Sequence, residues 1–110
     1  MSLTQLENGA LTDECDLDDI GTAWINHNSI NSLITDSKKR VDFLFVTVHA
    51  GVEDIEIPLP EWRIRYKELI VLGADAIIGS HPHVPQGWEE FRGKPIFYSL
   101  GNFCFESNSD

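Results

Sequence analysis

Three histidines stand at positions in this chain where ligands of a metal ion are often found. His81 and His83 are one residue apart and follow the apolar run 76–78. His49 follows the other clear apolar run, residues 43–48. Imidazole nitrogens bind zinc at about 2.0–2.1 Å, and a catalytic zinc often has three protein ligands and one open position. The pattern therefore predicts a metal site, and a metal site indicates hydrolytic chemistry.

The residue between the paired histidines, Pro82, favours a common direction for their side chains. In an extended segment, residues i and i+2 point the same way. Proline fixes its own φ and biases the preceding residue away from helix, which would stiffen the spacer. His81 and His83 would then face one cavity. The alternative is that both are ordinary polar residues of a surface loop, and the matching position of His49 favours the metal.

A strand, a helix and a second strand are predicted to position these histidines. Residues 43–48 are almost all aromatic or β-branched, which is typical of a strand covered on both faces. Pro60 suits the first turn of the following helix, and Gly73 suits its end before the run 76–78. Four apolar residues recur at the spacing of one helix face: Trp62, Tyr66, Leu69 and Ile70. Such a unit forms a right-handed crossover between parallel strands, so the three histidines should share one carboxyl edge, where open α/β sheets bind ligands.

The segment after the paired histidines predicts a β-hairpin. Residues 84–91 and 95–100 have the pattern of strands, and residues 92–94 connect them with a glycine in the turn. Gly101 is expected to meet a demand for positive φ or for close approach of another segment. Asn102 could face the site, although a role in the turn is the commoner one.

Residues 1–28 are predicted to form an acidic N-terminal arm, and residues 29–110 the partial domain described below. Trp24 and Ile25 could dock this arm on the domain, and Ser29 is expected to cap a first helix. The arm holds a cluster of acidic residues: Asp13, Glu14, Asp16, Asp18 and Asp19. The cluster lacks the spacing and the glycine of a calcium-binding loop, so a solvated loop or a helix entry is expected instead.

Composition limits the classes of protein to which this chain can belong. Its 110 residues suit one domain, and 42% hydrophobic and 24% charged residues are typical of a globular protein. A net charge of −10 argues against nucleic acid or an anionic membrane as partner. We expect no membrane span and no signal peptide in this sequence. Cys15 and Cys104 could form a disulfide, but their spacing does not show it.

Residues 41–105 resemble the bacterial capsule-synthesis family (CapA, poly-γ-glutamate synthesis), a branch of the calcineurin-like metallophosphoesterases. Three ordered motifs carry the resemblance, at residues 42–51, 73–84 and 94–103. The fold that it implies is α/β, the C-terminal half of a metallophosphoesterase-like α/β sandwich, with a βαβ unit followed by a β-hairpin.

The resemblance also implies roles for particular residues. His49 corresponds to a single-histidine metal motif, and His81 and His83 to a Gly-x-His-x-His motif with one imidazole for each metal of a pair. Glu53 matches an acid that often follows the first motif. Glu53 and Asn102 are expected beside the ligands or the substrate. The implied cofactor is a dinuclear centre of Mn, Zn or Fe, in which two ions clamp the attacking and leaving oxygens of a phosphoester.

Two departures from the family pattern bear on activity. Ala50 stands where family members commonly have tryptophan, so one wall of the pocket could be open. The early ligand motifs of the superfamily (Asp-x-His, Gly-Asp-x-x-Asp and Gly-Asn-His/Asp) have no counterpart here. Carboxylates balance the charge of the metals, and neutral imidazoles do not. We therefore expect the C-terminal fragment of a metal-dependent, phosphoesterase-type hydrolase of capsule or poly-γ-glutamate biosynthesis, inactive on its own.

Other interpretations remain open from the sequence. The chain could be a non-catalytic ligand-binding or structural module with an adventitious metal site, or another chain could supply the missing carboxylates. A half-fold would leave an apolar face and an unpaired sheet edge, so a homo-oligomer or a separate N-terminal half is the expected partner. Members of the family often act at the bacterial cell surface, although this sequence contains no signal or anchor.

Overall fold

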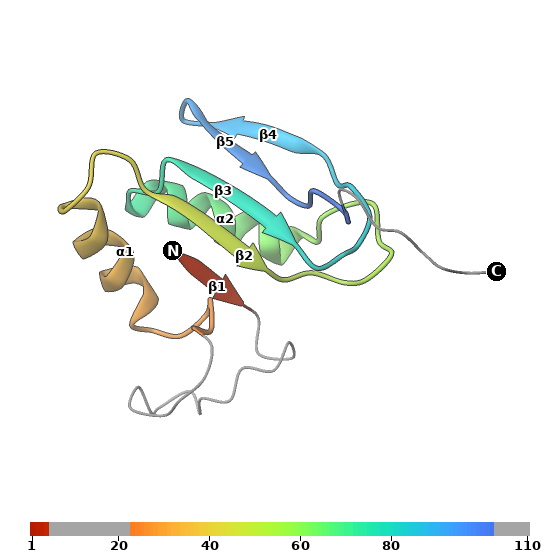
Figure 1. Cartoon of the computed structure of the whole chain (residues 1–110), viewed down its shortest axis with the longest axis horizontal. Coiled ribbons are helices and arrows are strands. Elements are labelled where there is room, and N and C mark those ends of the chain that lie inside the picture. The colour runs from red at the N-terminus through yellow and green to blue at the C-terminus, as the bar shows by residue number, and fades with distance from the viewer. Residues whose placement is uncertain (5–22, 103–110) are drawn as a thin grey trace.

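The computed structural model describes residues 1–4 and 23–102, which form a mixed α/β fold (Figure 1). The five strands of the described part make one sheet in the order β1-β2-β3-β5-β4. Four of these strands are parallel, and β4 runs antiparallel to β5. In chain order the elements are β1 (Ser2–Thr4), α1 (Ile30–Lys38), β2 (Phe45–His49), α2 (Pro60–Leu72), β3 (Ala76–Ser80), β4 (Trp88–Phe91) and β5 (Lys94–Phe97).

The predicted βαβ unit is confirmed in β2, α2 and β3. Pro60 lies in the first turn of α2, where its missing N–H has no helical acceptor to lose. Gly73 ends the helix with a φ of 131°, and its N–H donates to the carbonyl oxygen of Ile70 at 3.1 Å. Strands β2 and β3 are parallel, and their last residues, His49 and Ser80, lie opposite each other. The two strands therefore deliver their following loops to one edge of the sheet.

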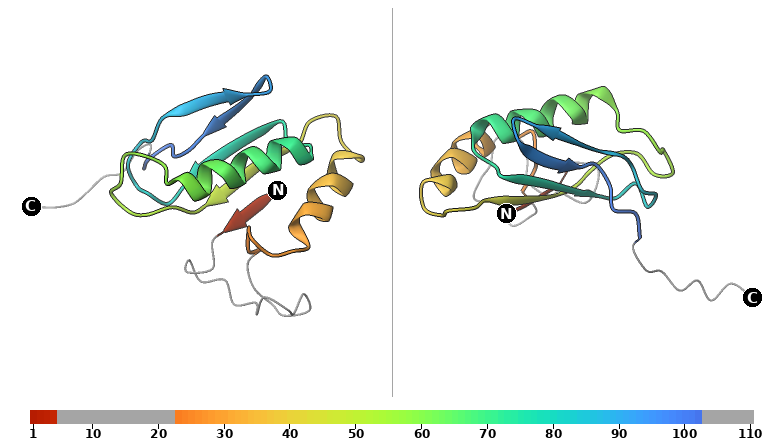
Figure 2. Two further views of the ribbon diagram at one scale, coloured as in Figure 1. Left: turned by 180° about the vertical axis from the view of Figure 1, so that it is seen from behind. Right: turned by 90° about the horizontal axis from the view of Figure 1, so that it is seen from above.

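Both helices lie on the same face of the sheet (Figure 2). Side chains of β2, β3 and β5 that point to this face are fully buried with side chains of the two helices. These core residues include Val46, Val48, Ile77 and Ile96 from the strands and Ile34, Tyr66 and Leu69 from the helices. None of the described helices is long and apolar enough to cross a membrane.

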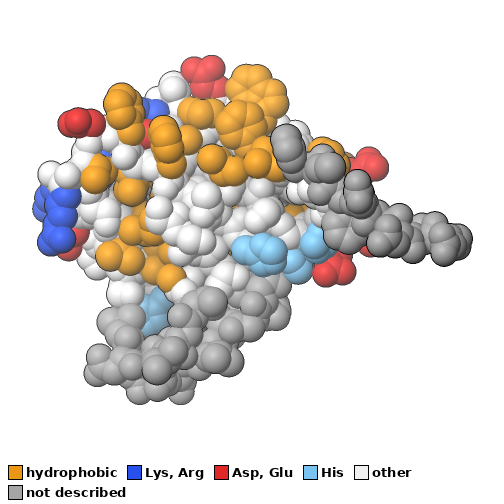
Figure 3. All heavy atoms as spheres, in the orientation of Figure 1, with side chains coloured by type: hydrophobic (Ala, Val, Ile, Leu, Met, Phe, Trp, Pro, Cys, Tyr) orange, Lys and Arg blue, Asp and Glu red, His pale blue; other side chains and the backbone are white. Residues whose placement is uncertain are grey.

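The opposite face of the sheet shows that one sequence prediction was wrong. Burial alternates along β2, and Phe45 keeps 56% of its surface exposed. Figure 3 shows this face, on which hydrophobic side chains gather over the sheet. The run 43–48 therefore forms a strand that is covered on one face within the described residues, because both helices pack on the other side.

The start of the chain joins the same sheet. β1 pairs in parallel with β2, and the backbone N–H of Ile25 donates to the carbonyl oxygen of Thr4 at 2.7 Å. Ile25 is fully buried in the core and Trp24 packs against it, as expected for residues that dock this segment. Ser29 precedes α1, but its hydroxyl contacts His27 Nδ1 at 2.7 Å and makes no capping bond. The acidic cluster and both cysteines lie outside the described residues.

The C-terminal hairpin is confirmed, with shorter strands than predicted. β4 and β5 pair through a turn in which Arg92 and Gly93 both have positive φ. Beyond them, an isolated bridge pairs Pro85 with Leu100, and the N–H groups of Gln86 and Tyr98 donate to the carbonyl oxygens of Ser99 and Gly87 at 3.1 and 3.2 Å. Gly101 has a φ of 68°, and a Cβ there would lie 3.0 Å from Pro85. Gly101 therefore has both predicted features, a positive φ and the close approach of another segment.

Candidate metal centre

The three predicted histidines meet at the carboxyl edge of the parallel strands. His49 is the last residue of β2, and the loop with His81 and His83 begins directly after β3. The ring centroids of His49 and His81 are 4.8 Å apart, and those of His81 and His83 are 5.7 Å apart. Histidine side chains form a group at this end of the sheet in Figure 3. Two loops that are far apart in the sequence thus bring imidazoles together.

Hydrogen bonds connect His49 to the strands behind it. The Ser80 hydroxyl donates to the carbonyl oxygen of Val48 at 3.3 Å, so its oxygen accepts the N–H of His49 Nδ1, 3.2 Å away. His49 Nε2 is then an acceptor, and it lies 3.2 Å from His81 Nδ1. This order of donors leaves Nε2 of His81 unprotonated. The contact between Ser80 and His49 was not predicted from the sequence. The predicted parallel pairing of the two strands could have indicated it, because both residues end their strands.

His83 is oriented by a different partner. Its Nδ1 donates to the side-chain oxygen of Asn102 at 2.8 Å, so the proton of the neutral ring lies on Nδ1. Its Nε2 is 3.9 Å from a carboxylate oxygen of Glu53. Asn102 therefore lies beside His83, and its place next to a metal ligand stays a prediction. Metal-binding histidines commonly donate their second N–H to such an oxygen, which fixes the tautomer and the ring.

Glu53, His81 and His83 form a group that could hold a metal ion. One ligand atom from each lies within 4.8 Å of the others. Glu53 and His83 are exposed, and His81 is half-buried. Two nitrogens bound to one zinc at about 2.0–2.1 Å lie roughly 3–4 Å apart, so small rotations would complete a common site. A donor set of imidazole and carboxylate suits Zn, Mn or Fe in the divalent state.

The backbone around the paired histidines differs from the predicted extended spacer. His81 and His83 have φ values of 103° and 62°, and Asp54 in the facing loop has 61°. The cause is tertiary: Pro82 is fully buried, and its carbonyl oxygen accepts the N–H of Asp54 at 2.9 Å. Burying Pro82 turns the chain on both sides of it. Positive φ in a residue with a side chain costs about 1–3 kcal/mol, and such strain clusters at functional sites.

Partial burial favours the neutral form of the His49 imidazole. Partial burial lowers its pKa below the ordinary value, and positive charge on His81 or His83 would lower it further. A neutral imidazole can accept a hydrogen bond or bind a metal, whereas a charged one can do neither. Near neutral pH, His49 can therefore accept a hydrogen bond or bind a cation.

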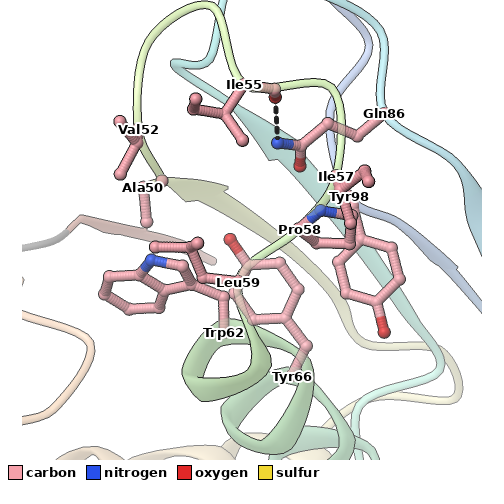
Figure 4. A pocket seen from close by; sticks show the side chains of 11 residues that line it. Ala50, Val52, Ile55, Ile57, Pro58, Leu59, Trp62, Tyr66, Gln86 and Tyr98 are labelled. Carbon is pink, nitrogen blue, oxygen red and sulfur yellow. Dashed lines mark hydrogen bonds between the residues drawn. The ribbon is translucent and has the colours of Figure 1, made fainter.

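His49 and His83 are exposed, and His81 is half-buried. A hollow beside them is lined by other residues, namely Ala50, Gly51, Val52, Ile55, Ile57, Pro58, Leu59, Trp62, Tyr66, Gln86 and Tyr98 (Figure 4). Its free space is about 10 Å³, enough for one water molecule. Gln86 Nε2 donates to the carbonyl oxygen of Ile55 at 2.7 Å and holds the covering loop closed. Ala50 is fully buried in this wall.

Known proteins place the chain in a family. The model of "Bacterial capsule synthesis protein PGA_cap" matches residues 3–107. Over 74 residues, 67% of this chain, it is 40% identical to the PGA biosynthesis protein CapA of Bacillus subtilis (strain 168) and covers 20% of that protein. Over 69 residues, 63% of this chain, it is 42% identical to the capsule biosynthesis protein CapA of Bacillus anthracis and covers 17% of it.

The match is a partial one with respect to these relatives, because the chain spans a fifth or less of their length. An uncharacterized protein of Sinorhizobium fredii, y4sH, shows the same relation, with 39% identity over 71 residues and 15% of its length. The family model nevertheless covers nearly all of the chain, including the strands, the hairpin and the three histidines. The chain belongs to the bacterial capsule synthesis (PGA_cap) family.

Proposed function

We propose that this chain carries the histidine-bearing part of a divalent-metal site in a CapA-type, phosphoesterase-like protein of capsule or poly-γ-glutamate biosynthesis. The observation that supports this most directly is the meeting of His81, His83 and Glu53 within 4.8 Å at the carboxyl edge of the sheet. Membership of the capsule synthesis family supports the biological setting. His81 and His83 would hold the ion, with His49 assisting.

The role of each side chain follows from its contacts. Asn102 holds the His83 ring, and Ser80 and His49 hold the His81 ring. A bound divalent ion would supply positive charge for the oxygens of a phosphoester. That charge matters here because the chain carries a net charge of −10 and would otherwise repel an anionic substrate.

We also propose that the chain does not hydrolyse phosphoesters by itself. The carboxylate motifs that complete the two-metal centre of the superfamily have no counterpart in this sequence. One ion without its partner lacks the clamp on both the attacking and the leaving oxygen. Carboxylates from outside these 110 residues would be required for turnover.

The test compares the wild type with His83→Ala in calorimetric titrations with Mn²⁺ and Zn²⁺ and in a phosphodiesterase assay at matched metal. We expect weak binding of one ion per chain that is lost in the variant, and equal background hydrolysis by both proteins. Binding should weaken below about pH 6.5, because protonated imidazole cannot bind a metal. Robust wild-type turnover that His83→Ala abolishes would contradict the proposed inactivity.

A non-catalytic module is the second candidate, and the exposure of the histidines favours it. A catalytic site usually excludes water, whereas His49 and His83 lie open to solvent. The titration above separates the two candidates. Absence of stoichiometric binding would leave the ligand-binding or structural role as the better account.

The sheet face that residues 1–4 and 23–102 leave uncovered leads us to propose a homo-oligomer. Side chains of Thr47, Ile78, Phe97 and Trp88 form one row across this face. The rings of Trp88 and Phe97 stack with centroids 6.0 Å apart, and Trp88 remains 64% exposed. Apolar patches of this kind commonly mark interaction sites. Light scattering should report a dimer or larger assembly that Trp88→Ser weakens, and a clean monomer at high concentration would refute it.

A further inference from the structure

The outer face of α2 carries a row of apolar side chains that faces solvent. Ile64 and Val71 lie about two turns apart on this helix and keep 61% and 54% of their surface exposed. A groove of about 410 Å³ is lined by both and by Asn31, Lys67, Glu68 and Leu72. Figure 2 shows α2 on the outside of the molecule, with the sheet behind it. The groove therefore lies on the opposite side of the molecule from the uncovered sheet face.

Opposite charges flank this apolar row on its two sides. Lys67 is on the side of the hairpin, where its ammonium lies 5.5 Å from the centre of the Phe91 ring. Glu68 is on the side of α1, where it pairs with Arg65, whose guanidinium also binds Asn31. Both charged side chains stay partly in solvent, with 32% of Lys67 and 55% of Glu68 exposed. Each can therefore still pair with a group of another molecule.

We propose that α2 binds the α2 of a second copy of this chain, with the two helices parallel about a two-fold axis. The charges select this direction. A two-fold rotation that keeps the helices parallel brings the Lys67 side of one copy against the Glu68 side of the other, and the reverse pair forms by symmetry. A rotation that makes them antiparallel would place Lys67 beside Lys67 and Glu68 beside Glu68, and such like-charge contacts are unfavourable.

The apolar rows meet in register in the parallel arrangement. Ile64 would contact Ile64 of the second copy, and Val71 would contact Val71. Side chains at a spacing of about seven residues keep facing a parallel partner helix, as they do in the seam of a coiled coil. The groove beside the row gives the second copy's side chains room to insert. Because each copy carries a net charge of −10, we expect a dimer that dissociates on dilution.

This contact is separate from the proposed metal site and from the proposed sheet contact. A chain that uses both α2 and the sheet face would form assemblies larger than a dimer. The two contacts must therefore be separated experimentally, and Trp88→Ser allows this because it weakens the sheet contact and leaves α2 unchanged.

The experiment measures sedimentation equilibrium of the Trp88→Ser chain over a range of concentrations. We expect a monomer–dimer equilibrium. Adding Ile64→Asp should raise the dissociation constant of the dimer by about tenfold or more, because it places two carboxylates in the apolar seam. Ile57→Asp is the matched control: Ile57 is 74% exposed but lies outside the groove, so the change should be less than about threefold. Thermal unfolding shows whether each variant is folded.

Two results would overturn the α2 contact. One is a Trp88→Ser chain that remains monomeric at every concentration, and the other is an equal effect of Ile64→Asp and Ile57→Asp. Assembly of the wild type that is lost in Trp88→Ser alone would leave the sheet contact standing, so the two proposals fail separately.

Disulfide cross-linking tests the direction of the helices, in the Trp88→Ser chain with Cys15 and Cys104 replaced by serine. Ile64→Cys should cross-link to itself on mild oxidation, because a parallel pair brings the two Cα atoms within the roughly 4–7 Å that a disulfide spans. Ile57→Cys measures cross-linking by random collision. An antiparallel pair would cross-link only in a mixture of Ile64→Cys and Val71→Cys, and that result would overturn the parallel arrangement.

A charge exchange gives an independent test of the same arrangement. Lys67→Glu alone should weaken the dimer by about tenfold, because it places glutamate beside Glu68 of the second copy twice. Adding Glu68→Lys restores the opposite pairs and should recover most of the loss. A double variant no better than Lys67→Glu would overturn the proposed pairing.

Discussion

Strands β2 and β3 carry a cluster of polar residues at each end, and the two clusters differ in how their polar groups are paired. At the amino end of β3, Asp75 is 8% exposed and both of its carboxylate oxygens are paired. Lys38 and Lys94 donate to them at 2.8 and 2.7 Å, and the N–H of Leu44 donates at 2.8 Å. This cluster joins α1 and β5 to the starts of β2 and β3, and it pairs both oxygens of the Asp75 carboxylate.

The carboxyl end of β2 and β3 carries His81 and His83, whose backbones both have positive φ. His81 and His83 are oriented by neighbours that use only one nitrogen of each ring. The comparison teaches how to separate a stabilising polar cluster from a binding one. The first pairs both oxygens of a buried carboxylate inside the protein, whereas in the proposed metal site His81 and His83 are each oriented through Nδ1.

The largest expected effect is at the amino end. Asp75→Ala leaves the N–H of Leu44 without its acceptor and two ammonium groups without their carboxylate. Because both lysines reach solvent, we expect a loss of about 2–3 kcal/mol in the free energy of unfolding, below the full cost of breaking a buried pair. Urea denaturation measures it. The exposed Asp42→Ala is the control and should change stability by less than about 0.5 kcal/mol; similar losses in both variants would contradict this view of the cluster.

The same cluster predicts how stability depends on pH. Hydrogen bonds from Lys38, then Lys94 and Leu44, hold the pKa of Asp75 well below its ordinary value. The stabilisation from Asp75 is therefore complete above the unfolded pKa of about 3.9 and is lost as the pH falls through the folded pKa. The stability difference between wild type and Asp75→Asn should be constant from pH 7 to 5. Below pH 4 it should shrink by up to about 1.4 kcal/mol per pH unit; a difference that stays constant down to pH 2.5 would count against the prediction.

The carboxyl end should respond in the opposite direction. His81→Gly removes the strain of a φ of 103°, and this gain exceeds the extra entropy that glycine loses on folding. We expect the variant to be more stable by about 1 kcal/mol and to lose Co²⁺ binding. His81→Ala is the matched control, because it removes the ring and keeps the strain. If His81→Gly is no more stable than His81→Ala, the positive φ stores no strain.

Local patterns in the sequence were sufficient for the elements and for the edge where the histidines meet. Pro60 and Gly73 mark the ends of α2 because their effects act on their own backbone. The order of strand, helix and strand fixes the parallel pairing that brings His49 opposite Ser80. The positive φ at Gly101 was also predictable, since glycine is the residue that tolerates it.

Contacts between distant segments could not be predicted in the same way. The turn at Pro82 depends on its burial against the loop of residues 51–54, which no spacing reveals. Lys38 is the last residue of α1, and its position there does not reveal that it binds Asp75, 37 residues away. The run 43–48 predicted two covered faces because apolar composition cannot show which layer packs on a sheet. Glu53 was expected only beside the ligands, because its approach to His83 depends on the same folded loop.

The smallest expected effect tests whether the Asp75 cluster acts as a unit. Lys38 and Lys94 are 34% and 42% exposed, so each ion pair alone contributes about 0.5–1 kcal/mol. Lys38→Met and Lys94→Met keep the apolar stems and remove one ammonium each, after which Asp75 still holds the other. The double variant leaves a buried carboxylate with only the Leu44 N–H, so its loss should exceed the sum of the single losses by at least about 0.5 kcal/mol. Urea denaturation of the four proteins gives this coupling directly. Additive losses would mean that the two lysines act independently. The amino end of β2 and β3 would then differ from the histidine end only through the paired Asp75 carboxylate, and not through a cooperative cluster.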